Sequence, residues 1–289
     1  AFPVPRNVGK FYIYDKQNLR SEILDAPSGA ESPRFDYQAT TASFAAKEFG
    51  AKHLVLGKDA RDFDRPVADL RQDAALSNMD KMLIHMENAF KTKATTTGNY
   101  PAALTSALAN AWDTNVGDPV EDVRAARQAC FETCGMRPKA MCMSQECLDS
   151  LKNHAGIVDR LKYVGIGAIN NADAVVNAIA SLFEMEEINI SDVVNLTSAE
   201  GATDVLAPIW TTDVLVYCKT NAAALKSMGY GRTFIVNQLS TKSINKPELA
   251  RGALGAEEVE TSWEWAQEFL GQDSTGDSIC GYLYTGAYT

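Results

Sequence analysis

The sequence contains no run of ~20 consecutive apolar residues, the length that a helix needs to span a membrane. Its opening residues, 1–6, also lack the apolar stretch of a secretory signal peptide. The chain has only three histidines, which leaves little material for a Ser-His-Asp arrangement. It has no Walker-type phosphate loop, and Gly165 and Gly167 lack the third glycine of a dinucleotide loop. These absences predict a soluble protein, made inside the cell, that is not an enzyme.

Basic residues are too few for tight binding to nucleic acid. The chain has 27 Lys and Arg residues against 37 Asp and Glu residues, which gives a net charge of −10. A protein that neutralises many phosphates needs the opposite sign. The composition therefore argues against direct wrapping of DNA.

Cysteines are few for a chain of 289 residues, and no secretory signal precedes them. We therefore expect reduced thiols packed in the core and not a disulfide framework. A thiolate or metal site is the alternative, because Cys130 and Cys134 share one predicted helix face and His154 follows soon after. The spacings differ from the close ligand pairs of zinc sites, so we expect no metal and no other cofactor. The six cysteines are Cys130, Cys134, Cys142, Cys147, Cys218 and Cys280.

An alternating pattern near the start predicts a long two-stranded ribbon over residues 9–44. Its first limb contains the aromatic run at 11–14, and a stretch typical of turns follows at 25–29. In the second limb, Phe35 and Tyr37 alternate with polar residues, which is the period of a strand with one sheltered face. The ribbon either packs on its own domain or reaches a neighbouring subunit.

Apolar residues at three- and four-residue steps predict one long amphipathic helix over residues 66–95. Pro66 suits its first turn, and Asp69 near the start and Lys93 near the end complement the helix dipole. At ~1.5 Å per residue the helix would be about 45 Å long, well beyond the mean for globular proteins. Such a helix beside a long ribbon indicates an elongated subunit.

Residues 118–236 mix helices and strands around one predicted core. Asp118 can cap a helix that has proline at its first position, and Gly135 can close that helix in a left-handed conformation. A buried strand is expected at residues 140–143, and Ser144 can cap the short helix after it. Further predicted elements are a helix over 173–183 and strands at 188–190, 215–217 and 234–236.

Residues 258–269 alternate between glutamate and apolar or aromatic side chains. Val259, Trp263, Trp265 and Phe269 take odd positions, whereas glutamates take even ones. This period of two predicts a long strand with one aromatic face and one acidic face. A final strand is expected at residues 279–284.

Several local phrases accompany this order of elements: Asp118-Pro119-Val120-Glu121-Asp122, Gly135-Met136-Arg137-Pro138, Met141-Cys142-Met143-Ser144, the segment with Leu148, Leu151 and His154, Leu161-Lys162-Tyr163, and Gly281-Tyr282-Leu283-Tyr284. Together they resemble the major capsid proteins of tailed bacteriophages with the Hong Kong 97-like fold. The resemblance covers nearly the whole chain and depends on the order of elements, because no phrase is a strict signature. Family members often have Asn after the proline of the second phrase, where this sequence has Lys139.

The resemblance implies an α+β subunit with five regions, which are an N-terminal arm (1–8), an extended β-hairpin loop (9–62), a peripheral domain with the spine helix (63–118), an axial domain (119–235) and returning strands of the peripheral domain (236–289). Such subunits assemble as hexamers and pentamers into an icosahedral shell around double-stranded DNA. Assembly would take place in the host cytoplasm, and the product would be the virion capsid. The implied partners are other copies of the chain, a portal, a scaffold or maturation protease, and decoration proteins, with no membrane.

Two other functions stay open. An encapsulin-type nanocompartment shares the fold implied above but encloses a protein cargo. A soluble α/β enzyme that uses the cysteine cluster is the more distant alternative. Some capsid proteins also cross-link neighbouring subunits through a Lys and an Asn, but this pair cannot be matched residue by residue here.

The predicted ribbon supplies the candidate functional surface. An isolated two-stranded ribbon is at best marginally stable in water, so its aromatic face should gain burial from an adjacent subunit. Arg34 and Asp36, on the opposite face, should make charge contacts across subunits that salt weakens. The candidate interface residues are Phe11, Tyr12, Tyr14, Arg34, Phe35, Asp36 and Tyr37.

Overall fold

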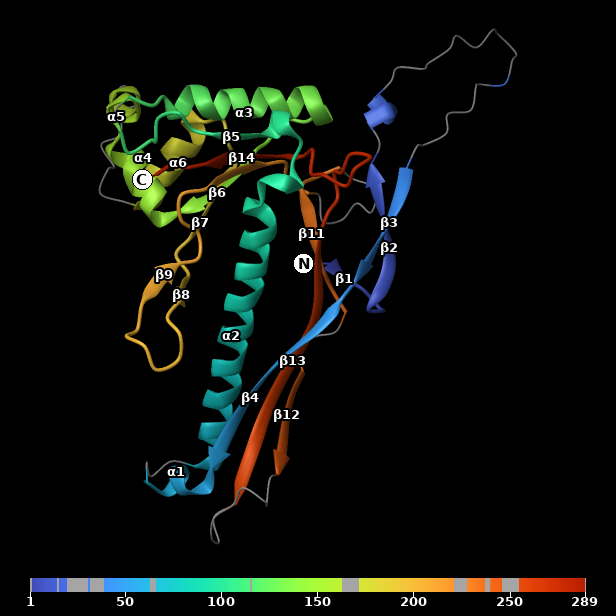
Figure 1. Cartoon of the computed structure of the whole chain (residues 1–289), viewed down its shortest axis with the longest axis vertical. Coiled ribbons are helices and arrows are strands. Elements are labelled where there is room, and N and C mark those ends of the chain that lie inside the picture. Colours follow the sequence, from blue (N-terminus) through green and yellow to red (C-terminus); the bar gives the residue numbers. More distant parts are fainter. Residues whose placement is uncertain are drawn as a thin grey trace. The chain divides into compact units, whose positions relative to one another are not determined.

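A computed structural model describes residues 2–14, 16–19, 31, 39–62, 66–114, 116–162, 172–220, 228–236, 240–245 and 255–288 (Figure 1). The chain forms two compact units. Unit 1 comprises Ala1–Lys10, Ser43–Phe90 and Arg232–Glu268, and unit 2 comprises Phe11–Ala42, Lys91–Gly231 and Phe269–Thr289. Each unit combines helices with a sheet, which confirms the predicted α+β class.

Unit 1 is built on a five-stranded sheet in which β13 (Ala256–Phe269) has the most partners. Along β13, Val259, Thr261 and Trp265 are buried, whereas the glutamates between them are partly exposed. The predicted alternation is therefore confirmed at Val259, Trp265 and Phe269, whereas Trp263 is only partly buried and Ala266, on the opposite face, is buried. The other strands are β4 (Lys47–Leu56) and β12 (Ser240–Asn245), both antiparallel to β13, β11 (Gly231–Ile235), also paired with β13, and β1 (Phe2–Pro3), parallel to β11.

The long helix α2 spans Val67–Thr95, as the sequence predicts. Ala74, Asn78 and Met82 recur at four-residue steps and are buried. Asn78 donates from Nδ2 to the carbonyl of Val259, at 3.0 Å, and Ala74 packs with Val259 and Val55. One stripe of α2 therefore covers the sheet of unit 1 (Figure 1). A short helix, α1 (Gly57–Asp62), follows β4.

Unit 2 contains a second five-stranded sheet, in the order β5-β14-β10-β6-β7. Its parallel pairs are β14 with β5 and β6 with β7, and its antiparallel pairs are β10 with β14 and with β6. Helix α3 contacts β14 and β10, and α4 and α6 contact β7. The strands are β5 (Thr105–Ala107), β6 (Ala140–Ser144), β7 (Glu187–Ser191), β10 (Val214–Tyr217) and β14 (Gly281–Thr285). The helices are α3 (Pro119–Cys134), α4 (Gln145–Asn153), α5 (Ala155–Lys162) and α6 (Ala172–Leu182), with 3-10 turns at Lys16–Leu19, Thr97–Asn99 and Ala102–Leu104.

The helix ends in unit 2 follow the predicted capping residues. The Asp118 carboxylate accepts hydrogen bonds from the backbone of Val120 and Glu121, at 3.1 and 3.3 Å. Gly135 closes α3 with a φ of 77°, in the left-handed region that favours glycine. The hydroxyl of Ser144 accepts from the backbone of Cys147 at 3.2 Å and so caps α4.

The core of unit 2 lies between its sheet and its helices. Trp112 is fully buried and donates from Nε1 to the Asp122 carboxylate at 2.8 Å. Burial raises the pKa of Asp122 above its ordinary value, although the bond from Trp112 opposes this shift. The largest fully buried side chains of this core include Met141, Met143, Leu148, Leu151, Ile157 and Ile179.

The division into five regions stays a prediction, but the structure shows to which sheet the strands of two of these regions belong. Residues 47–56, predicted within the hairpin loop, form β4 in the sheet of unit 1. Residues 281–285, predicted among the returning strands of the peripheral domain, form β14 between β10 and β5 in unit 2. Pairing with distant strands decides both placements, because a strand's own sequence does not specify its partner.

Candidate assembly surfaces

The predicted ribbon is present as a two-stranded sheet of β2 (Val8–Tyr14) and β3 (Ala39–Ala45). One face of β2 is sheltered. A side chain at Gly9 would overlap the ring of Phe44, and Phe11 is only 7% exposed. Phe44 is itself buried and stacks on Phe234 with 4.3 Å between ring centroids. The sheltered face therefore obtains its burial within the chain.

The opposite face of β2 is open to solvent. Val8 is 61% exposed, Tyr12 is 40% exposed, and Lys10 lies between them on the same face. Among the predicted interface residues, Tyr12 is thus on the open face and Phe11 on the sheltered one. The side chain of Tyr14, at the end of β2, lies outside the described part of the chain, as do Arg34, Phe35, Asp36 and Tyr37.

A second ribbon, which the sequence analysis missed, is formed by β8 (Val194–Leu196) and β9 (Leu206–Pro208) in unit 2. The strands are antiparallel, and Leu196 faces Leu206. Backbone bonds extend the pairing on both sides, from Thr197 to Val205 at 2.9 Å and from Ile209 to Val193 at 2.8 Å. Ile209 and Trp210 are buried and anchor the base of the ribbon.

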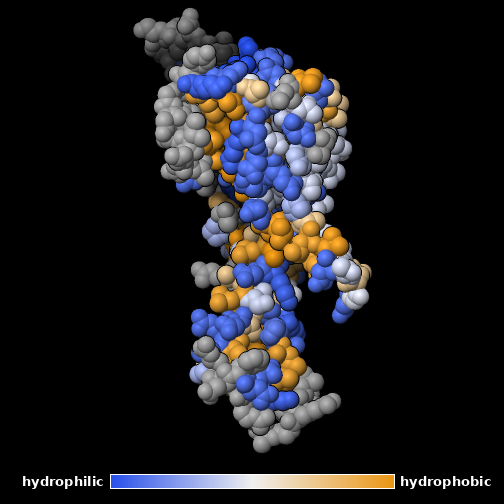
Figure 2. Space-filling model, turned by 90° about the vertical axis from the view of Figure 1, so that its left-hand side faces the viewer, coloured by the Kyte–Doolittle hydropathy of each residue, from blue (hydrophilic) through white to orange (hydrophobic). Residues whose placement is uncertain are grey.

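Apolar side chains on the β8–β9 ribbon face solvent. Four of them are between 47% and 68% exposed, namely Val194, Leu196, Val205 and Leu206. Figure 2 views the side of the molecule on which Figure 1 draws this ribbon, and apolar side chains gather on that face. Exposed apolar side chains grouped in this way mark surfaces that bind another molecule. Strands of three residues are too short for alternation to reveal them in the sequence.

The cysteine cluster behaves as core packing. All six cysteines are free and buried. Burial raises the pKa of Cys130 and raises that of Cys147 to about 12. Hydrogen bonds from Cys218 and Cys280 lower the pKa of Cys134, and the same bonds, together with burial, raise the pKa of Cys218 and Cys280. Cys134 is thus the exception among these thiols, but it is buried and its charge would be held by two neighbouring thiols. Protonated thiols are poor nucleophiles and poor metal ligands. Among the described residues, no group of three or more His, Cys, Asp or Glu side chains is arranged to hold a metal ion.

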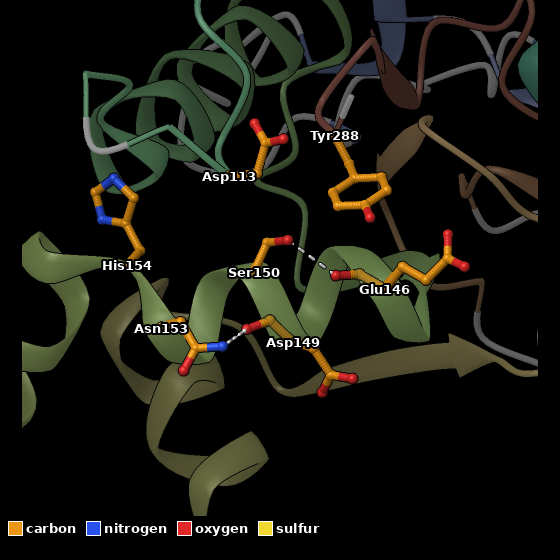
Figure 3. A pocket seen from close by; sticks show the side chains of 7 residues that line it. All are labelled: Asp113, Glu146, Asp149, Ser150, Asn153, His154 and Tyr288. Atoms are coloured by element: carbon orange, nitrogen blue, oxygen red, sulfur yellow. Dashed lines mark hydrogen bonds between the residues drawn. The ribbon is translucent and has the colours of Figure 1, made fainter.

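A cleft of about 490 Å³ in unit 2 is lined mainly by α4 (Figure 3). The Ser150 hydroxyl donates to the carbonyl of Glu146 at 3.1 Å, and Nε2 of His154 bonds to the carbonyl of Gly117 at 3.0 Å. Both side chains therefore serve the backbone, and the cleft offers negative charge without an activated nucleophile. Its lining residues are Asp113, Glu146, Asp149, Ser150, Asn153, His154 and Tyr288.

Solved structures share this fold over almost the whole chain. A phage-related protein from Bordetella bronchiseptica RB50 is 20% identical, with a TM-score of 0.72 over 99% of this chain and 89% of that one. The capsid structure of the cyanophage P-SCSP1u is 11% identical, with a TM-score of 0.57 over 100% and 86%. A virus-like particle from Pyrococcus furiosus is 9% identical, with a TM-score of 0.51 over 98% and 88%. No protein-family model matches the sequence, and no significant match was found among curated proteins.

The chain therefore has the α+β fold of phage capsid structures, as the sequence predicts. In the described part of the chain, no helix combines the length and the apolar character needed to cross a membrane.

Proposed function

We propose that this chain is a major capsid protein, a structural subunit that assembles as hexamers and pentamers into an icosahedral shell around double-stranded phage DNA. The observation that carries the proposal is the match of nearly the whole chain to a cyanophage capsid structure. Two ribbons with solvent-facing apolar side chains fit a subunit that is completed by its neighbours. The shell would be built in the host cytoplasm and become the virion capsid.

We propose no catalytic role. The six thiols are buried, and the serine and histidine of the α4 cleft are bonded to backbone carbonyls. A net charge of −10 also suits a shell wall that does not adhere to its contents. A portal, a scaffold or maturation protease and decoration proteins are the partners that such a shell would need.

An encapsulin-type nanocompartment is the second candidate. The similarity to the virus-like particle from Pyrococcus furiosus favours it, because that particle has the same fold. The two candidates differ in what the shell encloses, which is phage DNA in one case and a cargo protein in the other.

Negative-stain electron microscopy of the expressed chain tests the proposal. We expect closed shells, or hexameric and pentameric rings, with any scaffold or protease partner supplied. Particles purified from infected cells should contain DNA that nuclease cannot digest until the shell is opened. Protein cargo in place of DNA would favour the nanocompartment, and a strictly monomeric chain under all ionic conditions would refute both.

A further inference from the structure

We infer that the β8–β9 ribbon of one copy docks on the open face of β2 in an adjacent copy. The inference rests on the proposed shell function and identifies one contact that would hold neighbouring subunits together. The β2 face and the β8–β9 ribbon carry charges of opposite sign, and both expose apolar side chains.

The β8–β9 ribbon lies in a strongly acidic part of the chain. Residues 163–218 contain eight Asp and Glu residues and no Lys or Arg. Asp192, Glu200 and Asp204 belong to the ribbon and are exposed. Within the described part of the chain, none of these three carboxylates forms an ion pair.

Neighbouring carboxylates are neutralised inside the subunit. Glu186 pairs with Lys139 at 2.6 Å, Glu187 pairs with Lys219 at 2.6 Å, and Glu184 pairs with Arg127. The described part of the chain thus supplies a basic partner for the acidic residues beside β7 but not for those of the ribbon. The ribbon carboxylates are therefore available to a basic partner on another molecule.

Basic residues on and beside β2 carry the complementary charge, with Lys10 on its open face, Arg6 before the strand and Lys16 after it. The first 20 residues contain four Lys and Arg residues and one acidic residue. Arg6, Lys10 and Lys16 are exposed, and in the described part of the chain they form no ion pair. Basic side chains near β2 can therefore meet the carboxylates of the ribbon, which fixes orientation and excludes like-charged pairings.

Apolar contacts would supply most of the association energy. Val8 and Tyr12 flank Lys10 on β2, and the ribbon presents Val194 and Leu206 among its exposed side chains. Removal of these side chains from water favours association in proportion to the area buried. Charged residues around an apolar centre are the usual anatomy of a protein interface.

A second copy of this chain is the occupant that these surfaces fit. Because the two patches are different, the contact is heterologous, and a heterologous contact forms a closed ring when its rotation closes and an open filament when it does not. The same contact could therefore hold both the five- and the six-membered rings of the proposed shell. Every copy would use its ribbon on one neighbour and its β2 face on the other.

Charge reversal tests the contact. The double variant Glu200→Lys/Asp204→Lys should require an about tenfold higher chain concentration for assembly, measured by gradient sedimentation, because like charges would meet at the interface. Arg6→Glu/Lys10→Glu should have the same effect. A chain that carries all four changes should regain wild-type assembly, which no folding defect would produce. Asp73→Lys/Asp80→Lys, at exposed carboxylates of α2 that also form no ion pair within the described residues, is the matched control and should assemble normally.

Cross-linking tests the location. A Val8→Cys chain is mixed with a Leu206→Cys chain during assembly and treated with a short bismaleimide, while the six native cysteines are buried. We expect covalent dimers that contain one chain of each kind.

The outcomes separate this inference from the proposed function. If the wild type forms shells and both double variants also assemble normally, the contact is wrong but the proposed shell function stands. The same holds if the quadruple variant does not recover assembly. Dimers absent from assembled particles, or a ribbon that cross-links only to a protein other than this chain, would also overturn it. A wild-type chain that forms no multimer would overturn both proposals.

Discussion

A buried pair of tyrosine hydroxyls in unit 2 gives a sharp test of the core. The hydroxyl of Tyr100 donates to the carbonyl of Ala94 at 2.6 Å, and the hydroxyl of Tyr230 lies 2.5 Å from that of Tyr100. Because Tyr100 uses its proton for Ala94, Tyr230 is the donor between the two hydroxyls. Both side chains are only 4% exposed, so water cannot replace a lost partner.

Removal of the two hydroxyls should therefore have unequal effects. Tyr230→Phe leaves Tyr100 bonded to Ala94 and should lower the free energy of unfolding by about 1 kcal/mol. Tyr100→Phe strands the buried hydroxyl of Tyr230 and should cost about 2–3 kcal/mol. In the double variant no buried donor lacks a partner. Adding Tyr230→Phe to Tyr100→Phe should therefore raise the free energy of unfolding by about 1 kcal/mol.

Denaturant unfolding of the four chains, under one ionic condition that keeps them unassembled, measures this coupling. Tyr217→Phe is the control, since its hydroxyl accepts from Asn189 at the surface. Costs that simply add in the double variant would refute the assigned hydrogen-bond direction.

Alkaline pH gives a second readout of the same pair. Burial raises the pKa of both tyrosines above the ordinary value of about 10. Their contribution to stability is therefore complete below pH ~10 and is lost as pH rises further, because the unfolded chain ionises first. The double variant should lose less stability than the wild type in that range.

Two further predictions concern a helix end and the thiols. Gly135→Ala should lower the free energy of unfolding by about 1 kcal/mol through its φ of 77°, and by more if Leu19 cannot move away. Gly201→Ala, at φ 84° with no atom near the added side chain, should show only the cost of the left-handed backbone conformation. Thermal unfolding of both variants measures the difference. Cys147→Ala should cost about 1 kcal/mol. Elemental analysis should find no zinc in the wild type, and one zinc per chain would contradict the packing role.

Sequence reasoning succeeded where the determinants are local. Pro66 and the four-residue repeat of apolar positions located α2 to within one residue. Asp118 and Gly135 fixed the two ends of α3, because capping depends on a side chain or a φ at one position. The period of two along β13 revealed its buried face, since successive side chains of a strand point to opposite sides.

The candidate assembly surfaces could be predicted only in part, because the exposure of a side chain depends on the packing of segments that are distant in the sequence. Phe11 and Tyr12 are adjacent aromatic residues, yet only Tyr12 is open, since Phe11 is on the face of β2 that carries Gly9 and that face is sheltered. The β8–β9 ribbon could not be predicted from the sequence, because its strands have only three residues each. The sequence does show a long acidic stretch without Lys or Arg around this ribbon. Only the structure shows which of its carboxylates are exposed and so able to bind another molecule.

Each ribbon has a buried part and an open apolar part, and this division connects folding with assembly. Burial of Phe11, Phe44 and Ile209 gives the ribbons a folded base within one subunit. The open apolar side chains then contribute only when a neighbour covers them, and a fully buried Leu or Val is worth about 1.5–3 kcal/mol. Association consumes a comparable free energy through lost translation, rotation and side-chain freedom. A single proposed contact is therefore weak and reversible, whereas a copy within a closed ring is held by two, so incorrect additions dissociate before the ring closes.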